Sequence, residues 1–351
     1  MSEASPAGGA RTLFIVEREF LREHVGVRRV ILHYARAALR RGEILSLATP
    51  DGRGHLLEGF ADLSDTNVRN VSATAEAKSA PADWTSAQRM LHPHSTQERR
   101  SPPQRIALEW TDHAVRPEDF DRSVLTAPWV CRLPVPATPN LGGIVYDMVP
   151  NLLSLGALHM PVYAMAHHFA HQHHLGYQHL LDHASRILCI SASTRDDFLL
   201  LYGQEARPRI VVDIPYAAPP LLTMPAGTTG TRGVSSSDRR AAPRVLMVNV
   251  FDPRKNITNA VAALLTASRK ASFAVSIVGR ERMPLDRVLT ALEALADAGL
   301  DVSWYRDASD AQLDRLYHGS SVLLFPSLYE GLGLPILEAQ AAGLPVVSSD
   351  A

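Results

Sequence analysis

Two glutamates near the end of the chain, Glu330 and Glu338, stand with seven residues between them. Glu330 follows the apolar run 321–325 in a turn that contains Gly331 and Gly333, and Glu338 lies about two helical turns further on. A strand, a glycine turn and a helix N-terminus form an anion site, because free backbone N–H groups and the helix dipole point at the ligand. A carboxylate beyond that turn accepts hydrogen bonds from sugar or ribose hydroxyls. The pattern therefore predicts a site for a ligand with both phosphate and hydroxyl groups.

A second candidate segment, Asp252-Pro-Arg-Lys-Asn256, carries two adjacent cations. Arg254 suits a diphosphate because its guanidinium can fork onto two phosphate oxygens, and Lys255 supplies a point charge. A leaving diphosphate gains negative charge, so these cations would stabilise it without a metal ion. The alternative is a solvated pair at the start of a helix, which is what most Arg-Lys dipeptides are.

From residue 244 onward, apolar strands and amphipathic helices alternate strictly. The predicted strands are 244–250, 273–278, 301–305, 321–326 and 345–348, and the predicted helices are 258–271, 284–298, 309–318 and 334–342. Solid apolar strands in such an alternation indicate a parallel sheet that is covered on both faces. Ligands bind beyond the carboxyl ends of such strands. Both candidate segments follow strand ends, after the first and the fourth strand, so we expect them at the same edge.

The first part of the chain is less regular. It predicts strands at 12–16, 43–48, 143–147, 186–190 and 209–214, and helices at 27–41, 162–184 and 194–202, the last capped by Ser191 or Ser193. Residues 51–127 are polar and rich in turn residues, which indicates loops or an insertion. Gly, Ser and Thr dominate 223–243, which reads as a linker. We therefore expect two Rossmann-like domains, 1–222 and 244–351.

The segment 252–256 and the phrase Tyr329-Glu-Gly-Leu-Gly-Leu-Pro335 together resemble the donor-sugar site of retaining glycosyltransferases of family 4. The resemblance implies an α/β architecture of the GT-B type, with two facing Rossmann-like domains and parallel sheets. It implies that Glu330 contacts the transferred sugar near the reacting carbon and that Glu338 binds the ribose hydroxyls. The remaining residues it implies for donor binding are Gly331, Leu332, Gly333 and Asn256.

Two weaker matches lie in the first domain. The segment 23–30 is similar to the family's Gly-Ile-x-Arg segment, in which Gly26 would let a loop approach the donor phosphates; a plain glycine at a helix entry is the alternative. The segment 144–150 looks like the family's His-Asp-x-x-Pro strand end, with Tyr146 in place of histidine. The resemblance implies that Asp147 orients the acceptor hydroxyl or the donor sugar.

The chain departs from the family pattern in two further places. The family commonly has Val-Gly-Arg where this chain has Val248, Asn249 and Val250, so one phosphate contact is expected to be missing or moved to Arg254. Family members usually continue with further strands and helices beyond the position of Ala351. We therefore expect the second domain to be incomplete in this chain, with apolar surface uncovered on one face of its sheet.

Two other groups of residues have alternative interpretations. Seven histidines crowd one region, and pairs four residues apart suit a metal on one helix face; they are His167, His168, His171, His173, His174, His179 and His183. Only Asp182 joins them, so we favour a polar helix surface near the acceptor and expect no metal. The helix 27–41 is basic and amphipathic, which suits contact with anionic lipid, although a solvated first helix of the domain is favoured.

The composition excludes several functional classes. With 35 basic and 36 acidic residues the net charge is −1, so no global field would collect nucleic acid. No apolar run is long enough to span a membrane, and no signal peptide begins the chain, so a cytoplasmic location is expected. Cys131 and Cys189 lie in apolar surroundings and are expected to be buried and reduced.

The resemblance implies an enzyme that transfers a hexose from a nucleotide-diphosphate donor to an acceptor hydroxyl with retention, in polysaccharide or glycolipid assembly. It implies a carbohydrate or lipid-linked acceptor and no cofactor, and it allows peripheral membrane contact. The alternative is a non-catalytic nucleotide-sugar-binding or scaffold protein derived from a truncated transferase, which the departures above support. A dehydrogenase is disfavoured because no Gly-x-Gly-x-x-Gly follows the first strand of either domain. Sugar-nucleotide epimerases share the fold but fit the two glutamates less well.

Overall fold

The computed structural model describes most of the predicted elements. It covers residues 9–17, 25–50, 52–57, 111–129, 140–156, 167–203, 210–212, 242–306, 308 and 310–350. The described residues divide into two compact units, one up to residue 212 and one from residue 242. The predicted linker 223–243 lies outside them, apart from its last two residues. Each unit is described by itself.

The N-terminal unit is built on one eight-stranded sheet. Its strands are β1 (Arg11–Ile15), β2 (Ile44–Ala48), β3 (Arg53–Leu57), β4 (Thr111–Ala114), β5 (Arg122–Leu125), β6 (Leu141–Val145), β7 (Arg186–Cys189) and β8 (Ile210–Val212). They are arranged in the order β4-β3-β2-β1-β5-β6-β7-β8. The pairs from β2 through β1 and β5 to β8 are parallel, as expected for a Rossmann-like domain.

The prediction of a loop-rich insertion at 51–127 is wrong in part, because β3, β4 and β5 all fall inside that range. β5 pairs with both β1 and β6, in the middle of the sheet. It has only four residues, and its Ser123 is fully buried, so neither length nor composition marks it as a core strand. β3 pairs antiparallel with both β2 and β4, at one edge of the otherwise parallel sheet. Long-range pairing therefore decides structure that local pattern does not indicate.

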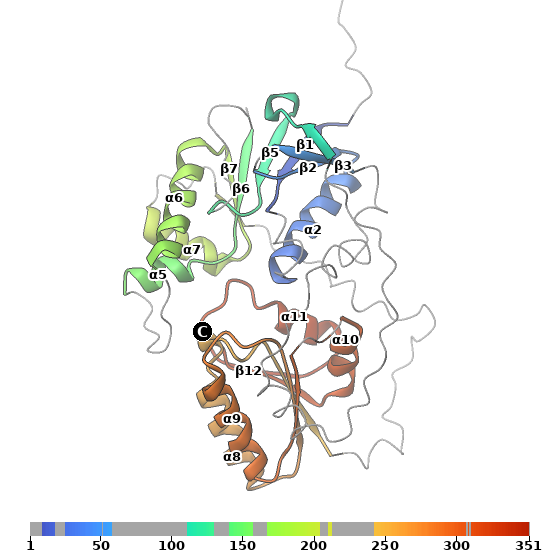
Figure 1. Cartoon of the computed structure of the whole chain (residues 1–351), viewed down its shortest axis with the longest axis vertical. Helices are drawn as coiled ribbons and strands as arrows, with labels where there is room; N and C mark the ends of the chain where they lie inside the picture. Colours follow the sequence, from blue (N-terminus) through green and yellow to red (C-terminus); the bar gives the residue numbers. More distant parts are fainter. Residues whose placement is uncertain are drawn as a thin grey trace, which may run out of the picture. The chain divides into compact units, whose positions relative to one another are not determined.

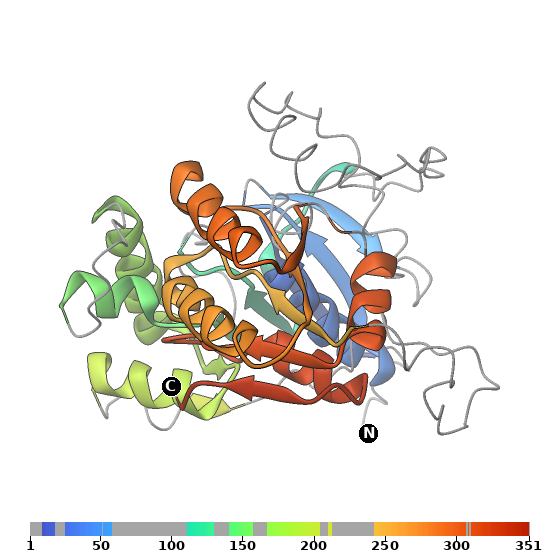
Figure 2. The same ribbon diagram turned by 90° about the horizontal axis from the view of Figure 1, so that it is seen from below.

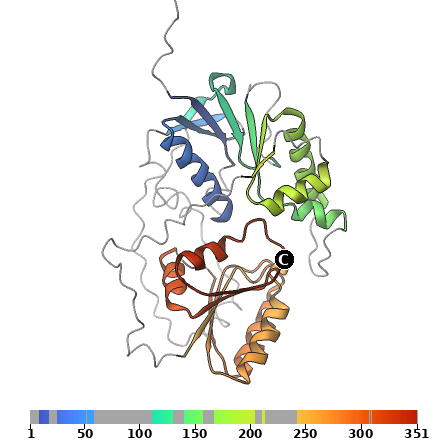
Figure 3. The same cartoon turned by 180° about the vertical axis from the view of Figure 1, so that it is seen from behind.

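The helices of this unit confirm most of the prediction. They are α2 (Val25–Arg40), α5 (Val149–Ser154), α6 (His167–His183) and α7 (Ala192–Tyr202), with a short 3₁₀ turn η2 (Pro117–Asp119). Figure 3 shows α5, α6 and α7 together near β6 and β7, and α2 beside β1 and β2. The short helix α5 was not predicted. Gly42, at a φ of +75°, lies just after α2, as expected of a glycine that ends a helix.

The apolar side of α2 is buried within its own unit. Val30, Ile31 and Ala35 are at most 2% exposed, so this face packs in the protein core and is not presented to lipid. No helix among the described residues is both long and apolar enough to cross a membrane. Cys189 lies buried at the end of β7, and burial raises the pKa of its thiol to about 12, which keeps it protonated and unreactive. Cys131 lies outside the described residues.

The C-terminal unit contains every element that the alternating pattern predicted. Its strands are β9 (Arg244–Val248), β10 (Ala274–Val278), β11 (Asp301–Tyr305), β12 (Val322–Phe325) and β13 (Val346–Ser348), and its helices are η6 (Pro253–Lys255), α8 (Ile257–Ser268), α9 (Leu285–Asp297), α10 (Asp310–Gly319) and α11 (Leu334–Ala341). The strand order is β11-β10-β9-β12-β13, and every pair is parallel. Figure 1 shows α8 and α9 on one face of this sheet and α10 and α11 on the other.

Two apolar clusters hold the helices against the sheet. Met247 and Ile277 face α8 and α9, where they join residues such as Leu264 and Leu292. Leu246 and its neighbours on the opposite face pack with residues from α10 and α11. The alternation along β9 follows from the two-residue period of a strand, which sends successive side chains to opposite faces. Figure 2, seen from below, again shows α8 and α9 side by side. On β13, Val347 is 55% exposed.

The cap of α7 offers a test of the local structure. The Ser191 hydroxyl accepts a hydrogen bond from the backbone N–H of Thr194 at 3.0 Å, as predicted for this N-cap. We expect Ser191→Ala to lower the free energy of unfolding by about 1 kcal/mol, because an N–H at the helix start loses its acceptor. Urea denaturation followed by circular dichroism measures this. Ser193→Ala is the matched control, because Ser193 lies two residues further along the chain and is exposed. Equal losses of stability in both variants would contradict the assignment of Ser191 as the cap.

Candidate functional site

The two candidate segments meet at one edge of the C-terminal sheet. β9 and β12 are parallel neighbours, with Val245 opposite Val322 and Leu246 opposite Leu323. The segment 249–256 leaves the carboxyl end of β9, and 326–333 leaves the carboxyl end of β12. The backbone N–H of Leu328 donates to the carbonyl of Arg254 at 2.7 Å, which ties the two segments together. The predicted common edge is therefore confirmed.

Asp252 organises the first segment. Its carboxylate accepts hydrogen bonds from the backbone N–H of Arg254 at 3.0 Å and from the guanidinium of the same residue at 3.1 Å to each oxygen. Burial alone would raise the pKa of Asp252, but the hydrogen bonds and charge of Arg254 outweigh it and hold the pKa below the usual range. The two guanidinium nitrogens of Arg254 that would bind two phosphate oxygens are thus hydrogen-bonded to Asp252 in this structure. Phosphate binding by Arg254 stays a prediction.

Lys255 and Glu330 meet although they are 75 positions apart in the sequence. The Lys255 ammonium donates to Oε1 of Glu330, and its Nζ lies 4.7 Å from the centre of the Phe325 ring. The Lys255 side chain is 11% exposed and that of Glu330 is 22% exposed. Burial lowers the pKa of Lys255, and the charge of Glu330 offsets only part of this effect. The edge therefore holds a nearly buried ammonium beside a carboxylate that solvent still reaches.

Asn256 and Gly333 shape the turns around this pair. Asn256 lies between η6 and α8 in the left-handed region, at φ +59°, and its side chain makes no cap hydrogen bond. Gly333, at φ +73°, takes the N-cap position of α11, and Gly331 and Leu332 lie in the loop before it. The N-terminus of α11 follows the Glu330 turn directly, as the anion-site pattern predicts. Donor contacts by these four residues remain predictions.

Glu338 has a different environment from Glu330. It lies on α11, is 2% exposed, and accepts a hydrogen bond from the Tyr317 hydroxyl at 2.5 Å. The two glutamates therefore present one partly solvated carboxylate and one buried carboxylate. Different environments suit different tasks, because a buried carboxylate is held by its partners whereas an exposed one can exchange them.

Gly26 and Asp147 belong to the N-terminal unit. Gly26 is exposed in the first turn of α2, which agrees with a glycine at a helix entry. Asp147 follows β6 at its carboxyl end, and its Oδ1 accepts a hydrogen bond from the backbone N–H of Val149 at 3.1 Å. The hydroxyl of Tyr177 donates to the backbone carbonyl of Asp147 at 3.0 Å. Asp147 thus occupies the kind of strand end where ligands bind, and its role toward a ligand stays a prediction.

Sequence reasoning missed three features of the site. It did not identify Asp252 as the partner of Arg254, although the two-residue spacing with an intervening proline is a capping signal. It did not connect Tyr317 to Glu338, because nothing in their spacing indicates contact. It also left Asn249 unexplained, where the family commonly has glycine. Asn249 is in the left-handed region at φ +55°, and asparagine adopts that region more readily than most residues.

The histidine-rich helix α6 does not form a metal-binding cluster among the described residues, where no group of three or more His, Cys, Asp or Glu side chains comes together. His173 is buried and stacks on Trp129 with ring centres 4.5 Å apart, so it belongs to the core and not to a polar surface. Burial lowers the pKa of His173, which keeps its ring neutral. The rings of His179 and His183 lie 4.8 Å apart, with His183 exposed and His179 partly buried.

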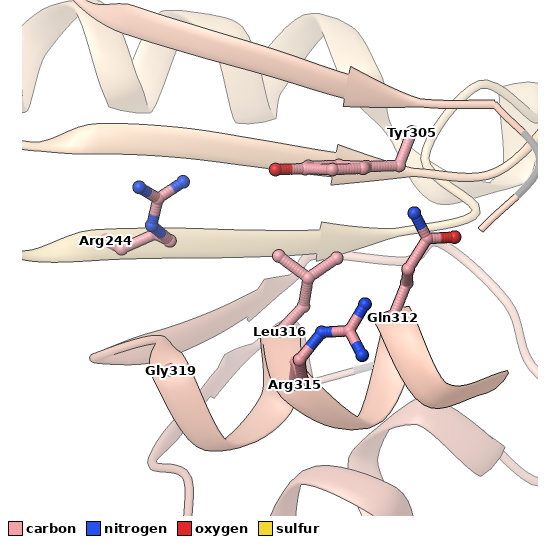
Figure 4. A pocket seen from close by; sticks show the side chains of 6 residues that line it. All are labelled: Arg244, Tyr305, Gln312, Arg315, Leu316 and Gly319. Carbon is pink, nitrogen blue, oxygen red and sulfur yellow. The ribbon is translucent and has the colours of Figure 1, made fainter. Parts of the chain in front are cut away.

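A separate cavity of about 290 Å³ lies beside α10 (Figure 4). In Figure 4, side chains of α10 face Arg244 and Tyr305 of the sheet. The lining residues are Arg244, Tyr305, Gln312, Arg315, Leu316 and Gly319. None of the predicted site residues lines it, so this cavity is distinct from the edge where Lys255 meets Glu330.

The backbone conformation of Asn249 allows a prediction about stability. Asn249→Ala should lower the free energy of unfolding by about 1 kcal/mol, since a left-handed conformation costs roughly 1–2 kcal/mol in residues with a Cβ and no compensating local hydrogen bond. Asn249→Gly should leave stability within about 0.5 kcal/mol, because glycine adopts this conformation without steric cost. Urea denaturation compares the two variants. A glycine variant as unstable as the alanine variant would show that side-chain contacts, and not the backbone, decide this position.

The Asp252–Arg254 pair gives a pH-dependent prediction. The pKa of folded Asp252 lies below the unfolded value of about 3.9, so its stabilisation is complete above that pH and disappears as the pH falls through the folded pKa. Asp252→Asn should therefore cost about 1–3 kcal/mol at pH 7, and the difference from the natural protein should shrink below about pH 4. Urea denaturation from pH 7 to pH 3 tests this. The exposed Asp297→Asn is the control; a difference that grows at low pH would contradict the assignment.

Residues 236–351 match the family model described as glycosyl transferases, group 1. The serotype-specific mannosyltransferase WbdA of Escherichia coli is 28% identical over 183 residues, which is 49% of this chain and 22% of WbdA. O-antigen chain mannosyltransferase B of Escherichia coli is 27% identical over 175 residues, 48% of this chain and 44% of that protein. The matched region thus spans less than half of either relative.

Solved structures show the same fold over nearly the whole chain. Anabaena Alr3699/HepE in complex with UDP and glucose has a TM-score of 0.53 at 13% identity, covering 97% of this chain and 81% of that one. WaaG, a glycosyltransferase involved in lipopolysaccharide biosynthesis, has a TM-score of 0.52 at 16% identity, covering 96% and 80%. The chain therefore has a GT-B-like α/β fold, and its residues 236–351 are similar to the glycosyl transferases, group 1 family.

Proposed function

We propose that this chain transfers a hexose from a nucleotide-diphosphate donor to an acceptor hydroxyl, with retention of the anomeric configuration. The observation that carries the proposal is the meeting of Lys255 and Glu330 at the carboxyl edge of β9 and β12, next to the N-terminus of α11. This edge of one unit therefore combines a cation that can bind phosphate, a carboxylate that can bind sugar hydroxyls, and a helix N-terminus that favours anions.

Lys255 is proposed to stabilise the leaving diphosphate. An ammonium has three N–H donors, and one of them is directed at Glu330 in this structure. A diphosphate that arrives at the edge carries more negative charge than one carboxylate, so it attracts the ammonium more strongly. The site is poorly solvated around Lys255, which strengthens each of these interactions. The reaction then needs no metal ion to neutralise the leaving group.

Glu330 is proposed to position the transferred sugar, because its partly exposed carboxylate can exchange Lys255 for sugar hydroxyls. Glu338, on the next helix, is proposed to bind the ribose. The glycosyl transferases group 1 match covers both glutamates. Two relatives are named as mannosyltransferases, one of them for an O-antigen chain, so we propose mannose as the first donor sugar to test and a glycan or glycolipid as the acceptor.

The proposal is tested with the purified full chain and a panel of UDP- and GDP-linked hexoses that includes GDP-mannose and UDP-glucose. Release of nucleoside diphosphate, with and without a glycan acceptor, reports turnover. The anomeric configuration of the new glycosidic bond on the acceptor, read by proton NMR, reports the stereochemistry. A product whose glycosidic bond has the inverted configuration would exclude retention. Donor binding without any turnover would favour a non-catalytic nucleotide-sugar-binding protein.

Single substitutions test the roles of Lys255 and Glu330 separately. Lys255→Ala and Glu330→Gln should each lower kcat by about 100-fold or more, because each removes an interaction that strengthens in the transition state. Lys270→Ala is the matched control, since this exposed lysine lies just past the end of α8, the helix that follows η6. Circular dichroism verifies that the variants fold. Full activity in Lys255→Ala would remove Lys255 from the mechanism.

A further inference from the structure

The contact between Tyr317 and Glu338 is unusual in its burial. Tyr317 is 1% exposed and Glu338 is 2% exposed, and the hydroxyl of Tyr317 donates to Oε2 of Glu338 at 2.5 Å. An oxygen-to-oxygen distance of this length is typical of a hydrogen bond to an ionised group. A carboxylate this deeply buried costs several kcal/mol unless hydrogen bonds compensate it. The structure therefore places the Tyr317 hydroxyl directly against a buried carboxyl group.

The fold holds both residues firmly. Tyr317 lies in the last turn of α10, on the side that packs with Leu323 and Phe325 of β12 and with Ala339 of α11. Figures 1 and 3 show α10 and α11 side by side on the same face of the sheet. Ala339, the immediate neighbour of Glu338 in the sequence, belongs to the same apolar cluster as Tyr317. The direction of the Glu338 side chain thus depends on α10 as well as on α11.

We propose that Tyr317 is a positioning residue that holds the Glu338 carboxylate for the ribose hydroxyls of the donor; this rests on the proposed function. Two adjacent ribose hydroxyls are donors, and a carboxylate accepts both only when its plane is correctly directed. A hydrogen bond to one carboxylate oxygen limits rotation about the end of the side chain. The Glu338 side chain then loses its conformational entropy when the protein folds and not when the ligand binds.

A purely structural role for Tyr317 predicts a different outcome from a positioning role. Tyr317→Phe keeps the ring and its packing and removes only the hydroxyl. If the ring alone matters, this variant binds nucleotides like the natural protein. If the hydroxyl positions Glu338, the variant loses affinity only for ligands whose ribose hydroxyls Glu338 contacts.

The experiment measures dissociation constants by isothermal titration calorimetry for the full chain. The probes are UDP and GDP, followed by the 2′,3′-dideoxy form of whichever nucleotide binds. We expect Tyr317→Phe to weaken ribonucleotide binding about tenfold, in keeping with the loss of a hydrogen bond to a charged group. Binding of the dideoxy nucleotide should stay within about twofold of the natural protein, because that ligand offers Glu338 no hydroxyl.

Two further variants complete the test. Glu338→Gln should weaken ribonucleotide binding similarly, and the double variant Tyr317→Phe/Glu338→Gln should lose little more, because residues that act as one unit are not additive. Arg315→Ala, on the cavity-lining face of α10, is the control and should bind both nucleotides as the natural protein does.

The outcomes separate this inference from the proposed function. If the natural protein binds no nucleotide, the proposed function fails and this inference fails with it. If the natural protein binds and Tyr317→Phe binds equally well, only the inference is overturned. Equal losses for the ribonucleotide and the dideoxy nucleotide, or fully additive losses in the double variant, likewise overturn it. Selective loss of the ribonucleotide supports it.

Discussion

The parallel pairing of β9 with β12 is the constraint on which the candidate site depends. These strands are separated by more than 70 residues of sequence, yet their carboxyl ends lie next to each other because the sheet places them as neighbours. Lys255 and Glu330 then meet without any covalent or local restraint. A buried ammonium is unfavourable on its own, and the carboxylate and the Phe325 ring face offset that cost. The same pairing that builds the core therefore also assembles the charges.

Charge balance divides this edge into two parts. Asp252 holds Arg254 through a forked pair that burial shields from solvent. Lys255 and Glu330 form a second pair in which the carboxylate remains more accessible. Without a ligand each cation therefore has an anion beside it, which keeps the edge stable in the absence of phosphate. The pair with the more accessible carboxylate is the one that an anionic ligand can reach and rearrange.

The sequence predicted the C-terminal unit well because its strands are solid apolar runs and its helices have a clear period, as in 274–278 and 285–297. It predicted the N-terminal unit less well, since β5 is short and carries a buried serine that only its pairing with β1 explains. Within the site, motif spacing located Glu330 and Lys255. It could not indicate that Tyr317 reaches Glu338, because that contact depends on how two helices pack, and packing is not a property of either segment alone.

The setting of Lys255 also bears on the composition of the chain. The sequence has three lysines and 32 arginines, so a cation chosen without regard to shape would be an arginine about ten times in eleven. Position 255 nevertheless holds a lysine, between the Phe325 ring and Glu330. A compact ammonium at the end of a flexible stem fits that narrow setting, whereas a planar guanidinium with five fixed donors is larger and oriented. The lysine at this position therefore provides a compact positive charge where an arginine would need more room and fixed directions for its donors.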